Sequence, residues 1–199
     1  MDIFTDFDTV LISGPVLSGR RQLFHQLLES WAAHSLIIST RDIAESVRMT
    51  HQEYNTATKH DPEPLIVDPL TSSLNHSVRD TNKIKYAQHP SNLSSIGTKF
   101  TNMLIENESS NLSVGVTTVS PLLVYAEASD VFDFVNTLIQ KSRGAGWPVV
   151  ITIDPRAHDE TIIEQLVPLF EAVIETRLTD ESDQEFRIRK PNSTEWESF

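Results

Sequence analysis

Two kinds of segment alternate along this chain: short runs of consecutive apolar residues, and longer segments in which apolar residues recur every three to four positions. The first kind is typical of strands buried on both faces, and the second is typical of helices with one apolar side. The pattern predicts strands at 9–12, 36–40, 64–68, 112–125 (interrupted at Pro121), 149–154, 172–176 and 185–189. It predicts helices around 24–31, 41–57, 93–104, 131–139 and 162–170.

Strands that alternate with helices predict an α/β fold in which a mostly parallel sheet carries helices on both faces. The last two strands are separated only by a short acidic turn, which predicts an antiparallel hairpin at one edge of the sheet. Residues 71–90 are polar without a clear period, which predicts a long surface loop. We expect one domain over residues 1–190 and a flexible tail over 191–199.

The composition narrows the class of protein. Of the 199 residues, 39% are hydrophobic and 22% are charged, which is typical of a globular chain. The chain has no cysteine, which excludes disulfides, thiolate catalysis and cysteine-based zinc sites. No apolar run approaches the length of a membrane-spanning helix, and the acidic N-terminus lacks a secretory pattern. We therefore expect a cytoplasmic protein with no membrane partner.

Charge and histidine spacing exclude two further classes of site. The formal net charge is −12, whereas a nucleic-acid binder generally needs a basic face, so no nucleic-acid partner is expected. None of the seven histidines pairs with another at the i, i+4 spacing of a helical metal site, and no metal site is predicted. His158, Asp159 and Glu160 are interpreted as the acidic start of a helix.

The segment after the first predicted strand carries the clearest chemical signal. Residues 14–21 read GPVLSGRR, which follows the Walker A template G-x-x-x-x-G-K-[ST] in spacing and in its strand–loop–helix context. Gly14 and Gly19 occupy the two template glycines, and Pro15 and Ser18 lie between them. A loop of this kind presents backbone N–H groups to a phosphate at the N-terminus of the following helix.

The last two positions of this segment depart from the template. Arg20 stands where a lysine contacts the β- and γ-phosphates, and Arg21 stands where a hydroxyl holds Mg²⁺. A guanidinium contacts phosphate but repels Mg²⁺, so ordinary hydrolysis is not expected. The alternative interpretation is a glycine-containing strand-to-helix turn that binds nothing.

Several short segments, taken in order, resemble a known family. They are LISGP at 11–15 with Gly19, LIVD at 65–68, the helix at 93–104 with IG at 96–97, VGV at 114–116 leading to SPLLVY at 120–125, and DP at 154–155 followed by AHDE at 157–160. Over residues 9–178 the chain resembles archaeal proteins of uncharacterised function, relatives of the RecA and KaiC-like ATPases. These are commonly described as inactivated RecA-superfamily ATPases implicated in signal transduction. The resemblance implies a RecA-like P-loop NTPase fold, a three-layer sandwich.

The resemblance also implies where a Walker B carboxylate would stand. In active KaiC-like relatives that acid ends the strand before the segment corresponding to SPLLVY. Here the position is Thr117, and a neutral hydroxyl cannot anchor Mg²⁺ through charge. Asp68, which ends the LIVD run, is either a displaced Walker B residue or a residue that lines the cleft or caps a turn. Asp154 is a further cleft candidate.

These departures predict a non-catalytic regulatory or signal-transduction protein on a degenerate P-loop scaffold. We expect it to bind a protein partner, or to form a homo-oligomer, and to bind ATP or ADP without Mg²⁺ and without hydrolysis. The alternative is a weakly active ATPase that uses Arg20 for phosphate and Asp68 or Asp154 for Mg²⁺. A third reading, a DNA-associated protein, is disfavoured by the charge of −12.

Overall fold

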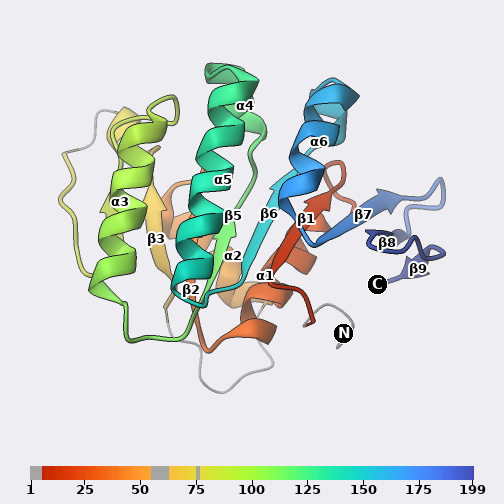
Figure 1. Ribbon diagram of the computed structural model, residues 1–199, viewed down its shortest axis with the longest axis horizontal. Helices are drawn as coiled ribbons and strands as arrows, with labels where there is room; N and C mark the ends of the chain where they lie inside the picture. Colours follow the sequence, from red (N-terminus) through yellow and green to blue (C-terminus); the bar gives the residue numbers. More distant parts are fainter. Residues whose placement is uncertain (1–5, 55–62, 75–76) are drawn as a thin grey trace.

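A computed structural model describes residues 6–54, 63–74 and 77–199 (Figure 1). Over these residues, nine strands form one sheet in the order β4–β3–β2–β5–β6–β1–β7–β8–β9. All neighbouring pairs up to β7 are parallel, and β8 and β9 are antiparallel additions at one edge. This is the mostly parallel sheet with an edge hairpin that the alternation of strands and helices predicts.

The described strands are β1 (Thr9–Ser13), β2 (His34–Ile38), β3 (Leu65–Asp68), β4 (Ile84–Tyr86), β5 (Leu112–Val116), β6 (Val149–Ile153), β7 (Ala172–Leu178), β8 (Gln184–Lys190) and β9 (Glu197–Ser198). The described helices are α1 (Arg20–Trp31), α2 (Ala44–Tyr54), α3 (Leu93–Glu106), α4 (Ser120–Tyr125), α5 (Ala128–Gly144) and α6 (Glu160–Leu166), with short 3₁₀ helices η2 (Ser72–Leu74), η3 (Pro155–Ala157) and η4 (Val167–Leu169).

Helices cover both faces of the sheet and make three layers (Figure 1). Helices α3 to α6 pack on one face, over a core that includes Leu11 of β1. Helices α1 and α2 pack on the other face, over a second core that includes Val10 and Ile12 of the same strand. Because successive side chains of a strand point to opposite faces, a strand buried on both faces must be apolar at every position.

The predicted strand over 112–125 is wrong beyond Val116. β5 ends there, and Ser120–Tyr125 form helix α4 instead. Pro121 lies in the first turn of α4, where its missing N–H costs nothing and its fixed φ favours a helix. The apolar residues of this segment therefore reflect a helix that buries Leu122 against the sheet, and the proline marks a helix start.

The predicted loop over 71–90 contains regular structure. It includes η2 and the strand β4, which pairs in parallel with β3. A strand this short carries too few positions to show a period. Residues 75–76 lie outside the described residues. So do residues 55–57 of the helix predicted over 41–57, which begins at Ala44.

The segment after β8, expected to be a flexible tail, folds back onto the hairpin. β9 pairs with β8, and the ring of Phe199 lies 5.3 Å from the ring of Phe186, centroid to centroid. The ring of Trp196 lies under the guanidinium groups of Arg177 and Arg187, at 4.1 and 4.7 Å from its centroid. These contacts attach residues 191–199 to the edge of the sheet.

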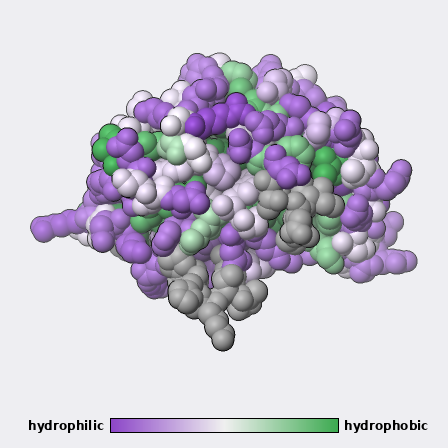
Figure 2. Space-filling model, turned by 60° about the horizontal axis from the view of Figure 1, so that its bottom comes forward, coloured by the Kyte–Doolittle hydropathy of each residue, from purple (hydrophilic) through white to green (hydrophobic). Residues whose placement is uncertain are grey.

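The surface of the described residues is mainly polar where it can be seen in Figure 2. This view turns the lower end of Figure 1 forward, and hydrophilic side chains prevail over scattered apolar ones. Within the described part of the chain, no helix combines the length and the apolar character needed to cross a membrane.

Candidate functional site

The carboxyl ends of β1, β2, β5 and β6 meet at one edge of the sheet, at the upper side of Figure 1. In an open parallel sheet this is the edge at which ligands bind. The loop of residues 14–19 leaves β1 at this edge and leads into α1. The segments after β2, β5 and β6 lie opposite that loop.

The two template glycines are required by the geometry of this loop. A Cβ atom on Gly14 would lie 1.8 Å from Oγ1 of Thr176 on β7, so only glycine fits. Gly19 has a φ of 85°, a left-handed conformation that glycine adopts without strain. A Cβ on Gly19 would lie 2.6 Å from the ring of Phe199.

The edge hairpin holds the residues between the two glycines. The Nε2 group of Gln184, on β8, donates to the carbonyl oxygen of Leu17 at 2.8 Å. The hydroxyl groups of Ser18 and Thr176 are hydrogen-bonded to each other, and the Ser18 hydroxyl also donates to the carbonyl of Pro15 at 2.8 Å. Leu17 has a φ of 69°, an unfavourable value for leucine that persists only where the surroundings impose it. The loop is therefore shaped by the hairpin as well as by its own sequence.

Arg20 extends from the first turn of α1, and its guanidinium donates to the carbonyl oxygen of Gly14. Burial lowers the pKa of Arg20, the carboxylate of Asp154 opposes that shift, and the charges of Arg41 and Arg21 add to it. An arginine nevertheless stays charged in a protein. The loop therefore encloses a fixed positive charge.

The two neighbouring arginines differ in their pairing. Arg21 forms a salt bridge with Asp42 at 2.7 Å, and both side chains are partly exposed. Arg41, in the loop between β2 and α2, forms no salt bridge with any carboxylate of the described residues. A groove of about 360 Å³ lies beside the loop, and all three arginines line it together with Gly19 and Gln184.

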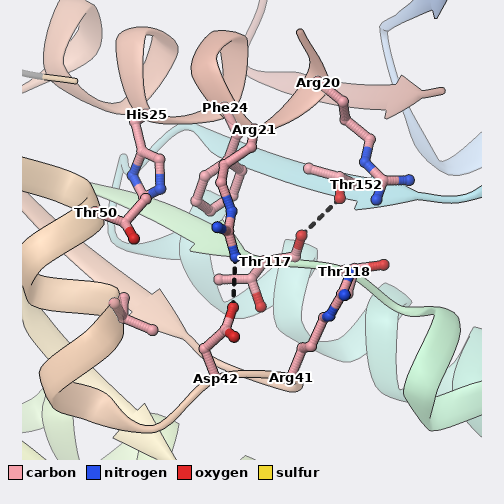
Figure 3. Close-up of a pocket in the computed structure, with 11 residues that line it drawn as sticks. Arg20, Arg21, Phe24, His25, Arg41, Asp42, Thr50, Thr117, Thr118 and Thr152 are labelled. Carbon is pink, nitrogen blue, oxygen red and sulfur yellow. Dashed lines mark hydrogen bonds and ion pairs between the residues drawn. The ribbon is translucent and has the colours of Figure 1, made fainter. Parts of the chain in front are cut away.

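A smaller cavity of about 50 Å³ lies next to this groove, between α1, α2 and the ends of β5 and β6 (Figure 3). The same three arginines reach it. Its inner wall carries the hydroxyl groups of Thr117, Thr118 and Thr152. In Figure 3, Arg20 and Arg41 approach these hydroxyl groups from opposite sides, and Arg21 points toward Asp42.

The structure thus brings most of the predicted site residues together. Thr117 follows β5 directly and lines the small cavity, as the resemblance implies for the Walker B position. Asp154 follows β6 and caps η3 by accepting from the backbone N–H of Arg156 at 3.1 Å. It also lies close enough to Arg20 to influence the pKa of that residue.

Asp68 lies elsewhere. Its carboxylate is fully buried at the end of β3 and accepts four hydrogen bonds, at 2.6 to 3.0 Å, from the N–H groups of Ala44, Leu70 and Thr71 and from the hydroxyl of Thr71. Two strands, β2 and β5, separate β3 from β6 in the sheet. Of the alternatives open for this residue, the structure shows the turn-capping one.

His25, which lines the small cavity, forms a buried pair with His51 that sequence reasoning missed. His25 of α1 and His51 of α2 lie with their Nδ1 atoms 3.0 Å apart, and the ring of His25 is stacked on Tyr54. Burial, the neighbouring His51 and the charge of Arg21 lower the pKa of His25 well below its ordinary value. Burial lowers the pKa of His51 to about 4, against the charge of Glu29. Both rings are therefore neutral at pH 7.

Arg41, Thr118 and Thr152 were also missed. Each follows or ends a strand whose carboxyl end faces the loop of residues 14–19, and this rule for parallel sheets is the signal that could have found them. As for cations, the described residues include no group of three or more histidine, aspartate or glutamate side chains placed to hold a metal ion. The chemistry offered at this edge is that of hydrogen-bond donors and positive charge.

Two solved structures from an archaeon share this arrangement of strands and helices. A KaiC-like protein from the hyperthermophilic archaeon Pyrococcus horikoshii superposes with a TM-score of 0.61 at 12% identity, over 96% of this chain and 85% of that one. An uncharacterized protein of the same organism, solved in complex with an unknown peptide, gives a TM-score of 0.61 at 13% identity, over 91% and 82%. The chain therefore has the α/β sandwich fold of KaiC-like, RecA-type proteins.

The chain belongs to DUF7504, a family of unknown function, whose family model matches residues 8–176. The match runs from the start of β1 to the middle of β7 and so includes the loop of residues 14–19 and all three arginines. No curated protein shows significant sequence similarity to the chain.

Proposed function

We propose that this protein is a non-catalytic regulator of signal transduction that binds a nucleotide, ATP or ADP, without Mg²⁺ and without hydrolysing it. The proposal rests on one observation. At the carboxyl ends of the strands, positively charged arginines stand where residues that hold Mg²⁺ would be expected. Arg20, Arg21 and Arg41 line the groove beside a loop with Walker A spacing. Guanidinium groups offer several N–H donors to the oxygens of a phosphate and need no bridging metal.

The acids near the groove support binding without a metal. Asp42 is already paired with Arg21, and Asp154 caps η3 close to Arg20. Thr117 offers a hydroxyl where the family resemblance expects an acid. A divalent ion placed among these groups would be repelled by the positive charges of the three guanidinium groups. Without that ion, the γ-phosphate lacks the neutralising charge that hydrolysis needs.

The size of the groove suits a nucleotide. Its volume of about 360 Å³ falls within the range of small-molecule pockets in proteins, roughly 300–1,000 Å³. The loop of residues 14–19 and the N-terminus of α1 would take the phosphates. Gln22 and Gln184, which also line the groove, offer amide groups to the rest of the ligand.

As a regulator, the protein would act in the cytoplasm and pass nucleotide occupancy to a protein partner or to a second copy of itself. The edge hairpin is the element we propose to transmit it, because it contacts the loop at Leu17 and Ser18, and Phe199, which follows β9, lies against Gly19. The solved protein of the same fold that is in complex with an unknown peptide is a precedent for partner binding on this scaffold.

A weakly active ATPase is the second candidate, and the position of Asp154 favours it. This carboxylate lies at the end of β6, near Arg20, at the edge where a metal ion would bind. The two candidates make opposite predictions for the dependence of binding on Mg²⁺ and for the effect of Asp154→Ala.

Titration calorimetry with ATP and ADP, in EDTA and in Mg²⁺ at constant ionic strength, tests the proposal. We expect affinities that differ by less than about threefold between the two conditions, and no phosphate release over hours. Arg20→Gln should weaken binding about tenfold or more, since a charge-assisted hydrogen bond contributes about 1.5–3 kcal/mol. Arg79→Gln is the matched control, because it removes the same charge from a surface loop away from the groove.

Two results would contradict the proposal. Mg²⁺-dependent binding with turnover that is lost in Asp154→Ala would establish the weakly active ATPase. Absence of binding by either nucleotide would show that the scaffold serves protein contacts alone.

A further inference from the structure

The small cavity beside the nucleotide groove has its own set of hydrogen-bond donors. Thr117, Thr118 and Thr152 line it and do not line the groove, whereas Arg20 and Arg41 reach both. Its walls are otherwise formed by the ion pair of Arg21 and Asp42 and by apolar or neutral side chains.

One hydroxyl hydrogen, that of Thr118, remains available in the cavity. The hydroxyl of Thr152 donates to the carbonyl oxygen of Thr117 at 2.6 Å, so its hydrogen is used. The hydroxyl of Thr40 donates to the carbonyl of Thr118 and is used in the same way. The hydroxyl of Thr117 accepts from the N–H of Thr40 at 3.1 Å, and that of Thr118 accepts from the N–H of Ser120 at 3.3 Å. The hydroxyl groups of Thr40 and Thr117 lie 3.4 Å apart, and because Thr40 donates to Thr118, Thr117 is the donor of that pair. The hydroxyl of Thr118 also carries one hydrogen, and this donor has no acceptor among the described residues.

The charges around the cavity are positive on balance. Arg21 is neutralised by Asp42, and Arg20 uses one N–H on the carbonyl of Gly14 and lies near Asp154. A guanidinium has five N–H groups, so Arg20 retains donors. Arg41 has no salt bridge to a carboxylate of the described residues, and its charge is uncompensated there.

The remaining wall of the cavity adds no negative charge. It is formed by Phe24 and Val47, which are buried and apolar, with Thr50 and His25. The ring of His25 is buried against His51 and is neutral at pH 7. Asp42, on the rim, is the carboxylate that lines the cavity, and it is held by Arg21.

We propose that this cavity binds a small tetrahedral oxyanion, phosphate or sulfate, directly and without a cation. Its volume of about 50 Å³ corresponds to roughly three to five water molecules, at 10–15 Å³ of such space each, which suits one oxyanion. Arg20 and Arg41 supply charge from opposite sides, and Thr118 supplies a hydroxyl donor. The position at which relatives would hold a metal ion thus takes an ion of opposite sign.

The site refines the proposed function, since the same cavity would take either a free oxyanion or the terminal phosphate of a nucleotide in the adjoining groove. The free oxyanion can bind whether or not a nucleotide does. Phosphate binding without nucleotide binding would support this site and contradict the proposed function. Nucleotide binding without phosphate binding would support the proposed function and contradict this site.

Titration calorimetry of the full chain with potassium phosphate, at constant ionic strength set with KCl, tests the site. We expect saturable one-to-one binding that is unaffected by EDTA. Arg41→Gln should weaken it about tenfold or more, and Thr118→Val, which keeps the shape of the side chain, about tenfold. Arg79→Gln, with the same change in net charge, should change it less than about twofold.

Competition distinguishes the two sources of the oxyanion. If ATP displaces phosphate and ADP does not, the cavity takes the terminal phosphate of a nucleotide; if neither displaces it, the ligand is the free ion. Absence of saturable phosphate binding would overturn the site. So would binding that Arg41→Gln and Thr118→Val leave unchanged. Arg41 is exposed, so its variant is expected to fold even if Thr118→Val does not.

Discussion

The ends of β3 and β5 show two different uses of the same edge of the sheet. At the end of β3, the carboxylate of Asp68 is fully buried and accepts hydrogen bonds from four donors on two chain segments. At the end of β5, Thr117 and Thr118 face a cavity in which the hydroxyl hydrogen of Thr118 lacks an acceptor and the guanidinium of Arg41 lacks a salt bridge among the described residues. The hydrogen bonds of the Asp68 carboxylate are made within the protein, whereas the cavity at the end of β5 contains donors without acceptors.

This difference separates a structural charge from a binding site. A buried polar group whose hydrogen bonds are all made stabilises one conformation and has nothing to offer a ligand. A group of donors that converges on a cavity without acceptors is paired only when a ligand supplies them. By this criterion Asp68 is structural although it ends a strand as a Walker B acid does, whereas Thr118 belongs to the proposed site although it is neutral.

The strongest test of this comparison is Asp68→Ala. We expect it to lower the free energy of unfolding by about 3–5 kcal/mol, because it leaves four buried donors without an acceptor. Urea unfolding measures the change. Asp180→Ala, at an exposed position, should stay within about 0.5 kcal/mol of the wild type. Phosphate affinity of the folded fraction should not change, and a selective loss of binding would place Asp68 in the site.

The histidine pair tests the comparison from the opposite wall of the cavity, since His25 lines the cavity without charge and is buried against His51. The folded-state pKa of His51 is lowered to about 4, so the stability it contributes is present above pH 6.5 and is lost as the pH falls toward 4. The loss is up to about 3 kcal/mol. In His51→Gln, unfolding free energy should therefore depend less steeply on pH between 6.5 and 4.

Urea unfolding at a series of pH values measures this dependence, and His34→Gln, at an exposed position, is the matched control. Parallel curves for the wild type and His51→Gln would show that the pair is not buried in its neutral form. In that case the cavity wall would carry positive charge, and the donor set proposed for the oxyanion would have to include it.

The smallest expected effect concerns the hairpin that shapes the loop. Phe199→Ala removes the ring that packs on Gly19 and Phe186, and should cost about 1 kcal/mol for a partly exposed side chain. Amide hydrogen exchange at residues 17–19 should become faster, because the loop loses one support. Phe199→Leu keeps an apolar contact, so its exchange rates should lie between those of the wild type and those of Phe199→Ala. Unchanged exchange would show that the loop holds its conformation without the ring of Phe199.

Several features of the site could be predicted from the sequence because they depend on residues close together along the chain. The spacing of Gly14 and Gly19 predicts the loop between a strand and a helix, and both glycines are required in the structure. Asn92 caps α3 in the same local way, since its side chain accepts from the N–H of Ser95 at 2.9 Å. Local backbone chemistry of this kind is decided within a few residues.

Other predictions failed where a local pattern has two meanings. The apolar run around Pro121 is compatible with an interrupted strand or with a helix that begins at the proline, and burial of Leu122 decides for the helix. The polar segment that contains β4 shows no period, because a three-residue strand is defined only by its pairing with β3.

The sequence by itself determined the alternation of strands and helices, the loop with its two arginines, and the presence of a threonine at position 117 in place of an acid. The tertiary structure alone decided that Arg41, Thr118 and Thr152 share one cavity with Arg20. These residues come from elements that are distant in the sequence, and they meet only because β5 and β6 insert between β2 and β1 in the sheet. Strand order depends on long-range packing of apolar faces, which no local pattern of residues encodes.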